Sequence, residues 1–349
     1  MQRAQCTKNR PGRPALVLAV LLFCAGAFYG CGGEKESPRE KPLIGVLVYR
    51  QDDAYIQLVT RAITETLSGR AEVEVAYAEG DQMVQNEQIG VLLGKKADAL
   101  ALNIVDPQAA FKAVDVVKKA GIPGVFFNRE PDLNSIKGHD KARFVGTNAS
   151  DAGVMQGDII SDLWRRHPEY DRNGDGKFQY VMIQANLDNP EAIARTEYSV
   201  KQARALGVDM QQIGDTLFCN WDDALAYEAM SLVFPLVGDK LELVIANNDS
   251  MALGAVRVLN EFEYNLAGGD PARRIPVVGV DAVPAAVEAI RQGRMSGTVV
   301  QDGKAMGEAV ALMMLNGIGG KDFLEGLPYA WDDSGIAIRI PYAPYTSED

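Results

Sequence analysis

Short, continuous apolar runs alternate with longer segments whose apolar residues recur at helical spacing, from Leu43 to the end of the chain. The short runs predict strands at residues 43–49, 73–78, 99–105, 122–127, 144–145, 178–183, 212–217, 241–246, 275–280, 296–300 and 336–340. The helical spacing predicts helices at residues 54–68, 83–93, 107–119, 151–165, 191–206, 222–237, 251–262, 284–291 and 305–316. Strands that are apolar throughout and separated by helices indicate parallel sheets covered on both faces. The strands outnumber those of one ordinary sheet, so the pattern predicts an α/β fold with two doubly wound lobes.

Polar residues gather directly after the predicted strands, where ligands bind in doubly wound sheets. They carry carboxylates, amides, guanidinium groups and aromatic rings: Asp52, Asp53, Tyr55, Asn128, Arg129, Glu130, Asn186, Asp188, Asn189, Glu191, Arg195, Trp221, Asn247, Asn248, Asp249, Asp281 and Gln301. Any single Asp or Asn in this set is typical of a cap on the helix that follows. Together, paired hydrogen-bonding groups suit neighbouring hydroxyls, and aromatic faces suit a pyranose ring. The set therefore predicts a site for a neutral polyol.

Motifs of the common enzyme classes are missing from the sequence. No G-x-G-x-x-G follows the first strand, and the segment at 174–177 lacks the spacing of a phosphate-binding P-loop. The two histidines, His139 and His167, do not follow predicted strands, which argues against a His-based triad or a His-rich zinc site. Asp53 and Glu191 form a conceivable glycosidase pair, but carboxylates in sugar sites commonly accept hydrogen bonds from hydroxyls. We therefore expect a binding protein rather than an enzyme.

The first thirty residues have the pattern of an export signal. A basic segment without acidic residues precedes an apolar run of fourteen residues, which is too short to span a membrane comfortably. The run ends at Gly30 and Cys31, which predicts a lipoprotein signal peptide at residues 1–30 and lipid attachment at Cys31. Phe28 and Tyr29 depart from the usual residues of such a site, so an ordinary signal peptide or an uncleaved anchor is the alternative. The polar residues 31–41 predict a flexible tether.

The composition limits which partners the protein can bind and in which compartment it can work. The chain has 349 residues, a formal net charge of −12 and a pI near 4.8. Because it lacks a basic patch, it is not expected to bind nucleic acid. Removal of the signal peptide would leave Cys31 and Cys219, and acylation of Cys31 would exclude an internal disulfide. We expect a periplasmic or extracytoplasmic protein that reaches a membrane through its lipid anchor alone.

One loop, at residues 171–179, has the spacing of a calcium site. It places oxygen ligands at alternate positions, with Gly176 where an EF-hand loop turns: Asp171, Asn173, Asp175, the carbonyl of Lys177 and Gln179. The bidentate Glu that closes an EF-hand is absent, because Met182 occupies its position. The segment is therefore either an Asp/Gly turn or a calcium loop completed by a carboxylate from elsewhere.

Several segments together resemble the periplasmic D-galactose/D-glucose-binding proteins of ABC sugar transporters, over residues 41–345. They are Ile44-Gly-Val with Asp52-Asp53, Asn103-Ile-Val-Asp-Pro107, Val125-Phe-Phe-Asn-Arg-Glu-Pro131, Val145-Gly-Thr147, Ala194-Arg-Thr196, Val244-Ile-Ala-Asn-Asn-Asp249, Gly279-Val-Asp281 and Gly297-Thr298. The resemblance implies the periplasmic binding protein type I fold, with two doubly wound parallel-sheet lobes joined by a three-segment hinge. It implies an N-terminal lobe of residues 42–147 and 302–334 and a C-terminal lobe of residues 148–301 and 335–349.

The resemblance also implies roles for individual residues. Ligand binding falls to ten positions: Asp53, Tyr55, Asn128, Asn189, Glu191, Arg195, Trp221, Asn248, Asp281 and Gln301. Tyr55, where the family has Phe, and Trp221 would sandwich the pyranose ring. Asn189, Glu191 and Gln301 stand where the family has His, Asp and Asn. Glucose and galactose are the first expected ligands, but these departures leave the anomer and epimer preferences open. A structural Ca²⁺ would bind the five oxygen ligands of the 171–179 loop, completed by Glu242.

The implied partners are a monosaccharide and an ABC permease with its ATPase, with a chemoreceptor as a further candidate. Sugar binding would favour a closed form of the two lobes, which the permease then recognises. Two other classes of function stay open from the sequence. One is a sensor that presents its sugar to a membrane receptor, and the other is a glycoside-processing enzyme.

Overall fold

The computed structural model describes residues 39–347, and the chain from Lys41 onward forms one compact unit. The predicted signal peptide, the lipidation site Cys31 and most of the predicted tether lie outside the described residues. Within the described range, no helix combines the length and the apolar character needed to cross a membrane.

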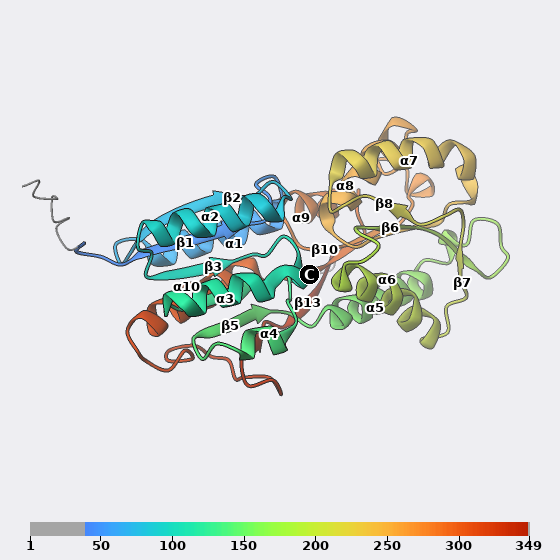
Figure 1. Cartoon of the computed structure of the whole chain (residues 1–349). Coiled ribbons are helices and arrows are strands. Elements are labelled where there is room, and N and C mark those ends of the chain that lie inside the picture. The colour runs from blue at the N-terminus through green and yellow to red at the C-terminus, as the bar shows by residue number, and fades with distance from the viewer. Residues whose placement is uncertain (1–38, 348–349) are drawn as a thin grey trace, which may run out of the picture. The chain divides into compact units, whose positions relative to one another are not determined.

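The first sheet has six strands in the order β12-β5-β4-β3-β1-β2, each parallel to its neighbours. They are β1 (Leu43–Val48), β2 (Glu72–Tyr77), β3 (Ala99–Leu102), β4 (Gly124–Phe127), β5 (Ala142–Gly146) and β12 (Ala337–Arg339). Four of them, β1, β2, β3 and β5, are labelled in Figure 1. Every residue of β1, β3 and β4 is buried, as expected for strands covered by helices on both faces.

The second sheet has seven strands, with β13-β11-β10-β9-β6-β7 in order and β8 paired to β6. They are β6 (Phe178–Gln184), β7 (Met210–Gln212), β8 (Leu217–Phe218), β9 (Leu243–Ala246), β10 (Val277–Asp281), β11 (Gly297–Gln301) and β13 (Tyr342–Thr346). All pairs are parallel except β11 with β13, which is antiparallel. The predicted strand at 212–217 is in fact the two short strands β7 and β8.

The described residues contain ten α-helices, and every helix predicted from the sequence is present. They are α1 (Ala54–Leu67), α2 (Gln82–Gly94), α3 (Ala110–Ala120), α4 (Leu133–Lys137), α5 (Ala149–Arg166), α6 (Pro190–Ala205), α7 (Asp223–Val237), α8 (Asp249–Glu261), α9 (Pro284–Arg291) and α10 (Gly303–Ile318). Short 3₁₀ helices are η1 (Pro107–Ala109), η2 (Pro168–Tyr170), η3 (Gly238–Lys240) and η4 (Pro271–Arg273). The prediction of two doubly wound α/β lobes is thereby confirmed.

Two closely packed helix pairs fix the elements that carry the site. At Gly307 of α10, an added Cβ would lie 2.5 Å from the Cβ of Ala62 in α1. At Gly157 of α5, it would lie 2.5 Å from the Cβ of Gln202 in α6. Any larger residue would push the backbones apart, because interiors are packed without spare volume. Glycine at these positions therefore sets how closely α1 and α6 are held within their own lobes.

The chain passes between the two sheets three times. It leaves the first sheet after β5, returns to it through α10 after β11, and leaves again after β12. The predicted third boundary at residue 335 is too early, because Ala337–Arg339 still pairs with β5. The following strand β13 was not predicted, since Pro344 interrupts its apolar pattern. Proline is tolerated there because β13 forms the edge of its sheet.

Candidate functional site

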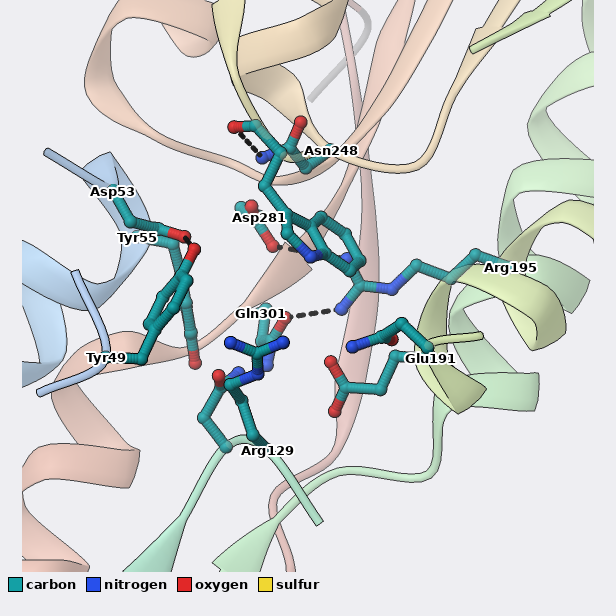
Figure 2. A pocket seen from close by; sticks show the side chains of 12 residues that line it. Tyr49, Asp53, Tyr55, Arg129, Glu191, Arg195, Asn248, Asp281 and Gln301 are labelled. Atoms are coloured by element: carbon teal, nitrogen blue, oxygen red, sulfur yellow. Dashed lines mark hydrogen bonds and ion pairs between the residues drawn. The ribbon is translucent and has the colours of Figure 1, made fainter. Parts of the chain in front are cut away.

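A cavity with about 350 Å³ of empty space lies where the carboxyl ends of strands from both sheets converge (Figure 2). Its lining residues are Tyr49, Asp53, Tyr55, Asn128 and Arg129 from the first lobe, and Asn189, Glu191, Arg195, Trp221, Asn248, Asp281 and Gln301 from the second. All ten residues predicted for ligand binding are thus brought together. Tyr49 and Arg129 also line the cavity; Arg129 belongs to the predicted strand-end set but not to the ten ligand-binding positions, and Tyr49 was not predicted.

In the first lobe, Asp53 is held by contacts at both of its oxygens. Its Oδ1 accepts a hydrogen bond from the backbone N–H of Ile56 (2.9 Å) and caps α1. Its Oδ2 accepts the phenol of Tyr49 (2.6 Å), as Figure 2 shows. Burial and the neighbouring Asp53 carboxylate raise the pKa of Tyr49 well above its usual value, so the phenol remains a donor. The guanidinium of Arg129 lies over the Tyr49 ring, 4.4 Å from its centroid.

Asn128 follows β4 with a left-handed backbone (φ 61°), which turns its side chain out of the strand direction. The buried Asn103, at the end of the neighbouring β3, donates to the Oδ1 of Asn128 (3.2 Å) and to the carbonyl of Phe127 (3.2 Å). This contact fixes the orientation of the Asn128 amide. Asn103 therefore supports the cavity without lining it.

In the second lobe, Arg195 of α6 is the central cation of the cavity and is only 2% exposed. It donates to the carbonyl of Asn247 (2.9 Å), to the Oε1 of Gln301 (2.8 Å) and to the hydroxyl of Tyr342 (3.1 Å). Burial lowers the pKa of Arg195, but Tyr342 and the carboxylates of Asp281 and Glu191 outweigh it, so the pKa is raised. The guanidinium therefore stays charged.

Two carboxyl groups face this cation, those of the buried Asp281 and the half-buried Glu191. Arg195 lies 3.7 Å from the nearest oxygen of Asp281, and Glu191 lies in the first turn of α6, four residues before Arg195. Burial raises the pKa of Glu191, and it raises that of Asp281 well above its usual value, while Arg195 opposes both shifts. A carboxylate accepts hydrogen bonds and a protonated carboxyl group also donates one, which suits hydroxyl ligands.

Asp249, behind the cavity, holds the turn that presents Asp281. Asp281 and Ala282 both have positive φ (114° and 54°), a strained backbone for residues with a side chain. The fully buried Asp249 carboxylate accepts from the hydroxyl of Thr298 (2.7 Å) and from the N–H of Val283 (2.9 Å). Burial raises the pKa of Asp249 to about 7. The sequence prediction missed this role, because Asp249 acts on the ligand only through its neighbours.

The two predicted aromatic residues, Tyr55 and Trp221, line the cavity from different lobes, and both are mostly buried. Two donors of the cavity have no hydrogen-bond partner among residues 39–347, namely the Nε of Arg195 and the Nε2 of Gln301. Buried donors without partners are costly unless a ligand accepts from them. The site thus combines apolar ring faces with free donors and with carboxylates. This chemistry suits a ring that carries several hydroxyls.

The 171–179 loop and Glu242 lie together, as predicted. The Glu242 carboxylate is 1% exposed, and it accepts from the N–H of Arg172 (2.7 Å) and from the N–H of Gln179 (3.0 Å). It thereby binds both ends of the loop. The pKa of Glu242 is raised overall, mainly because the carboxyl group is buried. The two backbone N–H donors oppose this rise, and the nearby Asp171 adds to it.

The oxygen atoms of this loop are the kind of ligand that a hard cation prefers. The Oε1 of Gln179 is buried and has no hydrogen-bond donor, while Asp171 and Asp175 accept from backbone N–H groups of the loop itself. In the described part of the chain, no group of three or more His, Cys, Asp or Glu side chains is arranged to hold a metal ion. The calcium site therefore remains a prediction.

Comparisons with known proteins point to one family. A family model described as the periplasmic binding protein domain matches residues 44–322. The D-galactose/methyl-galactoside binding periplasmic protein of Haemophilus influenzae is 35% identical over 303 residues, covering 86% of this chain and 88% of that protein. A putative rhizopine-binding protein of Rhizobium meliloti is 28% identical over 273 residues, covering 76% of this chain and 81% of that protein.

Solved structures share the same two-lobed fold. An ABC transporter solute binding protein from Bacillus halodurans with bound myo-inositol is 25% identical, with a TM-score of 0.69 and coverage of 88% of this chain and 95% of that one. A periplasmic solute binding protein from Actinobacillus succinogenes with bound D-allose is 20% identical, with a TM-score of 0.72 and coverage of 88% and 98%. The second likeness supports the fold alone.

Proposed function

This chain belongs to the periplasmic binding protein family as a sugar-binding component of ABC transporters, and we propose that its ligand is D-glucose or D-galactose. Family members bind solutes rather than convert them, and an ABC permease is the expected partner. The observation that carries the ligand proposal is the convergence of ten residues on one cavity, with an aromatic residue from each lobe. A further support is the relative from Haemophilus influenzae, whose name specifies D-galactose and methyl-galactoside.

Binding and lobe closure are coupled in this proposal. The ligand would contact Asp53 and Asn128 on the first lobe and Arg195, Asn248 and Asp281 on the second. Because only a closed arrangement lets both sets contact one ligand, the sugar would shift the population toward the closed form. The permease would then distinguish loaded from empty protein by shape.

Calorimetry on purified residues 32–349 tests the ligand assignment. A panel of hexoses, pentoses, polyols and amino acids should give saturable heat with D-glucose or D-galactose, together with a change in Trp fluorescence. No heat with any hexose would refute the assignment and leave the fold unaffected. Steady release of free sugar from a glycoside would instead favour an enzyme.

Two further features are part of the proposal. Calcium would bind Asp171, Asn173, Asp175, the carbonyl of Lys177, Gln179 and Glu242, and would stabilise the second lobe rather than act on the sugar. Lipid on Cys31 would anchor the protein to a membrane after removal of the signal peptide. Metabolic labelling with a radioactive fatty acid, compared between wild type and Cys31→Ser, tests the anchor.

A further inference from the structure

A second cavity adjoins the first and shares two of its lining residues. It has about 600 Å³ of empty space and is lined by residues of both lobes: Val105, Asp106, Pro107, Gln108, Arg129, Asn186, Asp188, Asn189 and Pro190. Arg129 and Asn189 line both cavities. The two cavities are therefore neighbours, with these two side chains between them.

Polar groups of the second cavity lack protein partners. The Arg129 guanidinium stacks on the Tyr49 ring but makes no hydrogen bond or ion pair to any described residue. Asn189 uses its Oδ1 to cap α6 through the N–H of Ala192 (3.0 Å), and its Nδ2 has no partner among the described residues. The Oδ1 of Asn186 is buried and has no donor. Such groups remain costly until a ligand or water satisfies them.

The chemistry of these groups selects a class of ligand. Arg129 and the Asn189 amide are donors, whereas Asp188 and the Oδ1 of Asn186 are acceptors. An anionic group would meet the carboxylates of Asp106 and Asp188, and an apolar group would leave the donors and acceptors unsatisfied. A second sugar ring supplies hydroxyls that both donate and accept.

We propose that the second cavity is a subsite for a sugar residue linked glycosidically to the pyranose in the first cavity. The inference rests on the proposed function and extends its ligand class from monosaccharides to disaccharides. The residue at position 189 controls the passage, because an Asn there is smaller than a His would be. Arg129 then donates hydrogen bonds to hydroxyls on both sides of the glycosidic linkage.

A disaccharide panel tests the subsite by calorimetry on residues 32–349. It compares D-glucose and D-galactose with their methyl glycosides and with gentiobiose, cellobiose, melibiose and lactose, which vary the linkage and the terminal sugar. We expect at least one disaccharide to bind as tightly as the free hexose or more tightly. If a free hexose binds and every disaccharide is at least 100-fold weaker, the subsite is refuted while the proposed function stands. If no saccharide binds, both are refuted.

A space-filling variant locates the second sugar. Gln108 is exposed, is the middle residue of η1, and lines the second cavity but not the first. Gln108→Trp should weaken the preferred disaccharide at least 10-fold and change the affinity for free hexose less than 2-fold. The matched control Gln108→Ala, which leaves the volume open, should weaken the disaccharide less than 5-fold. Equal effects of Gln108→Trp on hexose and disaccharide would contradict the inference.

Discussion

Replacing Arg195 with Met is the sharpest test of how the cavity is held together. The substitution keeps most of the side-chain volume but removes the guanidinium that bonds Asn247, Gln301 and Tyr342. It also removes the positive charge 3.7 Å from Asp281. The side chains of Arg195 and Asp281 are only 2% and 6% exposed. Water therefore cannot take the place of the lost guanidinium.

The expected loss follows from these contacts. Removing one partner of a buried ion pair costs about 3–5 kcal/mol, because the other charge is left uncompensated. Folded domains have a total stability of roughly 5–15 kcal/mol, so the loss is a large fraction. Arg195 opposes the raised pKa values of Asp281 and Glu191. Without it both pKa values rise further, and the carboxyl groups can escape the penalty only by binding protons.

The loss should therefore depend on pH. Urea unfolding of wild type and Arg195→Met should show a larger difference at pH 8, where protonation is unfavourable, than at pH 5. The double variant Arg195→Met/Asp281→Asn should recover at least half of the loss at pH 8. As a control, Arg257→Met breaks an ion pair with Asp223 in which both side chains are about half exposed, and should cost less than about 1 kcal/mol. A loss in Arg195→Met that is equal at both pH values would refute the electrostatic explanation.

Three further predictions concern separate parts of the molecule. Trp221→Ala should weaken hexose binding at least about 30-fold, equivalent to roughly 2 kcal/mol of lost ring burial, with an unchanged circular dichroism spectrum; Trp331→Ala, outside the cavity, should keep its affinity. Asp249 has a folded-state pKa of about 7, above its ordinary value of 3.8, so the folded state retains a proton longer than the unfolded state. The free energy of unfolding should fall as pH rises from about 4 to 7, by up to roughly 4 kcal/mol, and Asp249→Asn should remove this slope in a urea series. Chelation of calcium should lower the Tm of wild type by several degrees and that of Glu242→Gln by much less; an unchanged wild-type Tm would reject the metal.

The fold was predictable where local pattern and packing agree. Buried strands such as β1 and β4 are continuous apolar runs, and the helices between them have clear apolar faces, so their order implied parallel sheets. The strands that the sequence pattern did not predict correctly are short segments. The strands β7 and β8 have three and two residues, and β13 contains Pro344, so pairing with a neighbour rather than local sequence determines them.

The site was predictable because its residues follow strand ends, where the fold itself brings side chains together. The same rule already placed Arg129 in the candidate set, and it would have found Tyr49, which follows β1. Asn103 and Asp249 are different. They touch the cavity only through other residues, and their contribution depends on contacts between strands that no local spacing reveals.

Helix capping and ligand binding turn out to be compatible roles for one side chain. Asp53, Asn189 and Asn248 each cap a helix with Oδ1 and also line the cavity. The cap fixes the rotamer, so the second polar atom of each side chain already has its orientation before a ligand arrives. A parallel strand followed at once by a capped helix therefore prepares a binding group without added structure. For this reason Asn248→Ala should reduce stability by about 1 kcal/mol through loss of the cap. It should also weaken ligand binding by more than the loss of a single hydrogen bond would. The control Asp222→Ala, which removes a cap outside the cavity, should reduce stability alone.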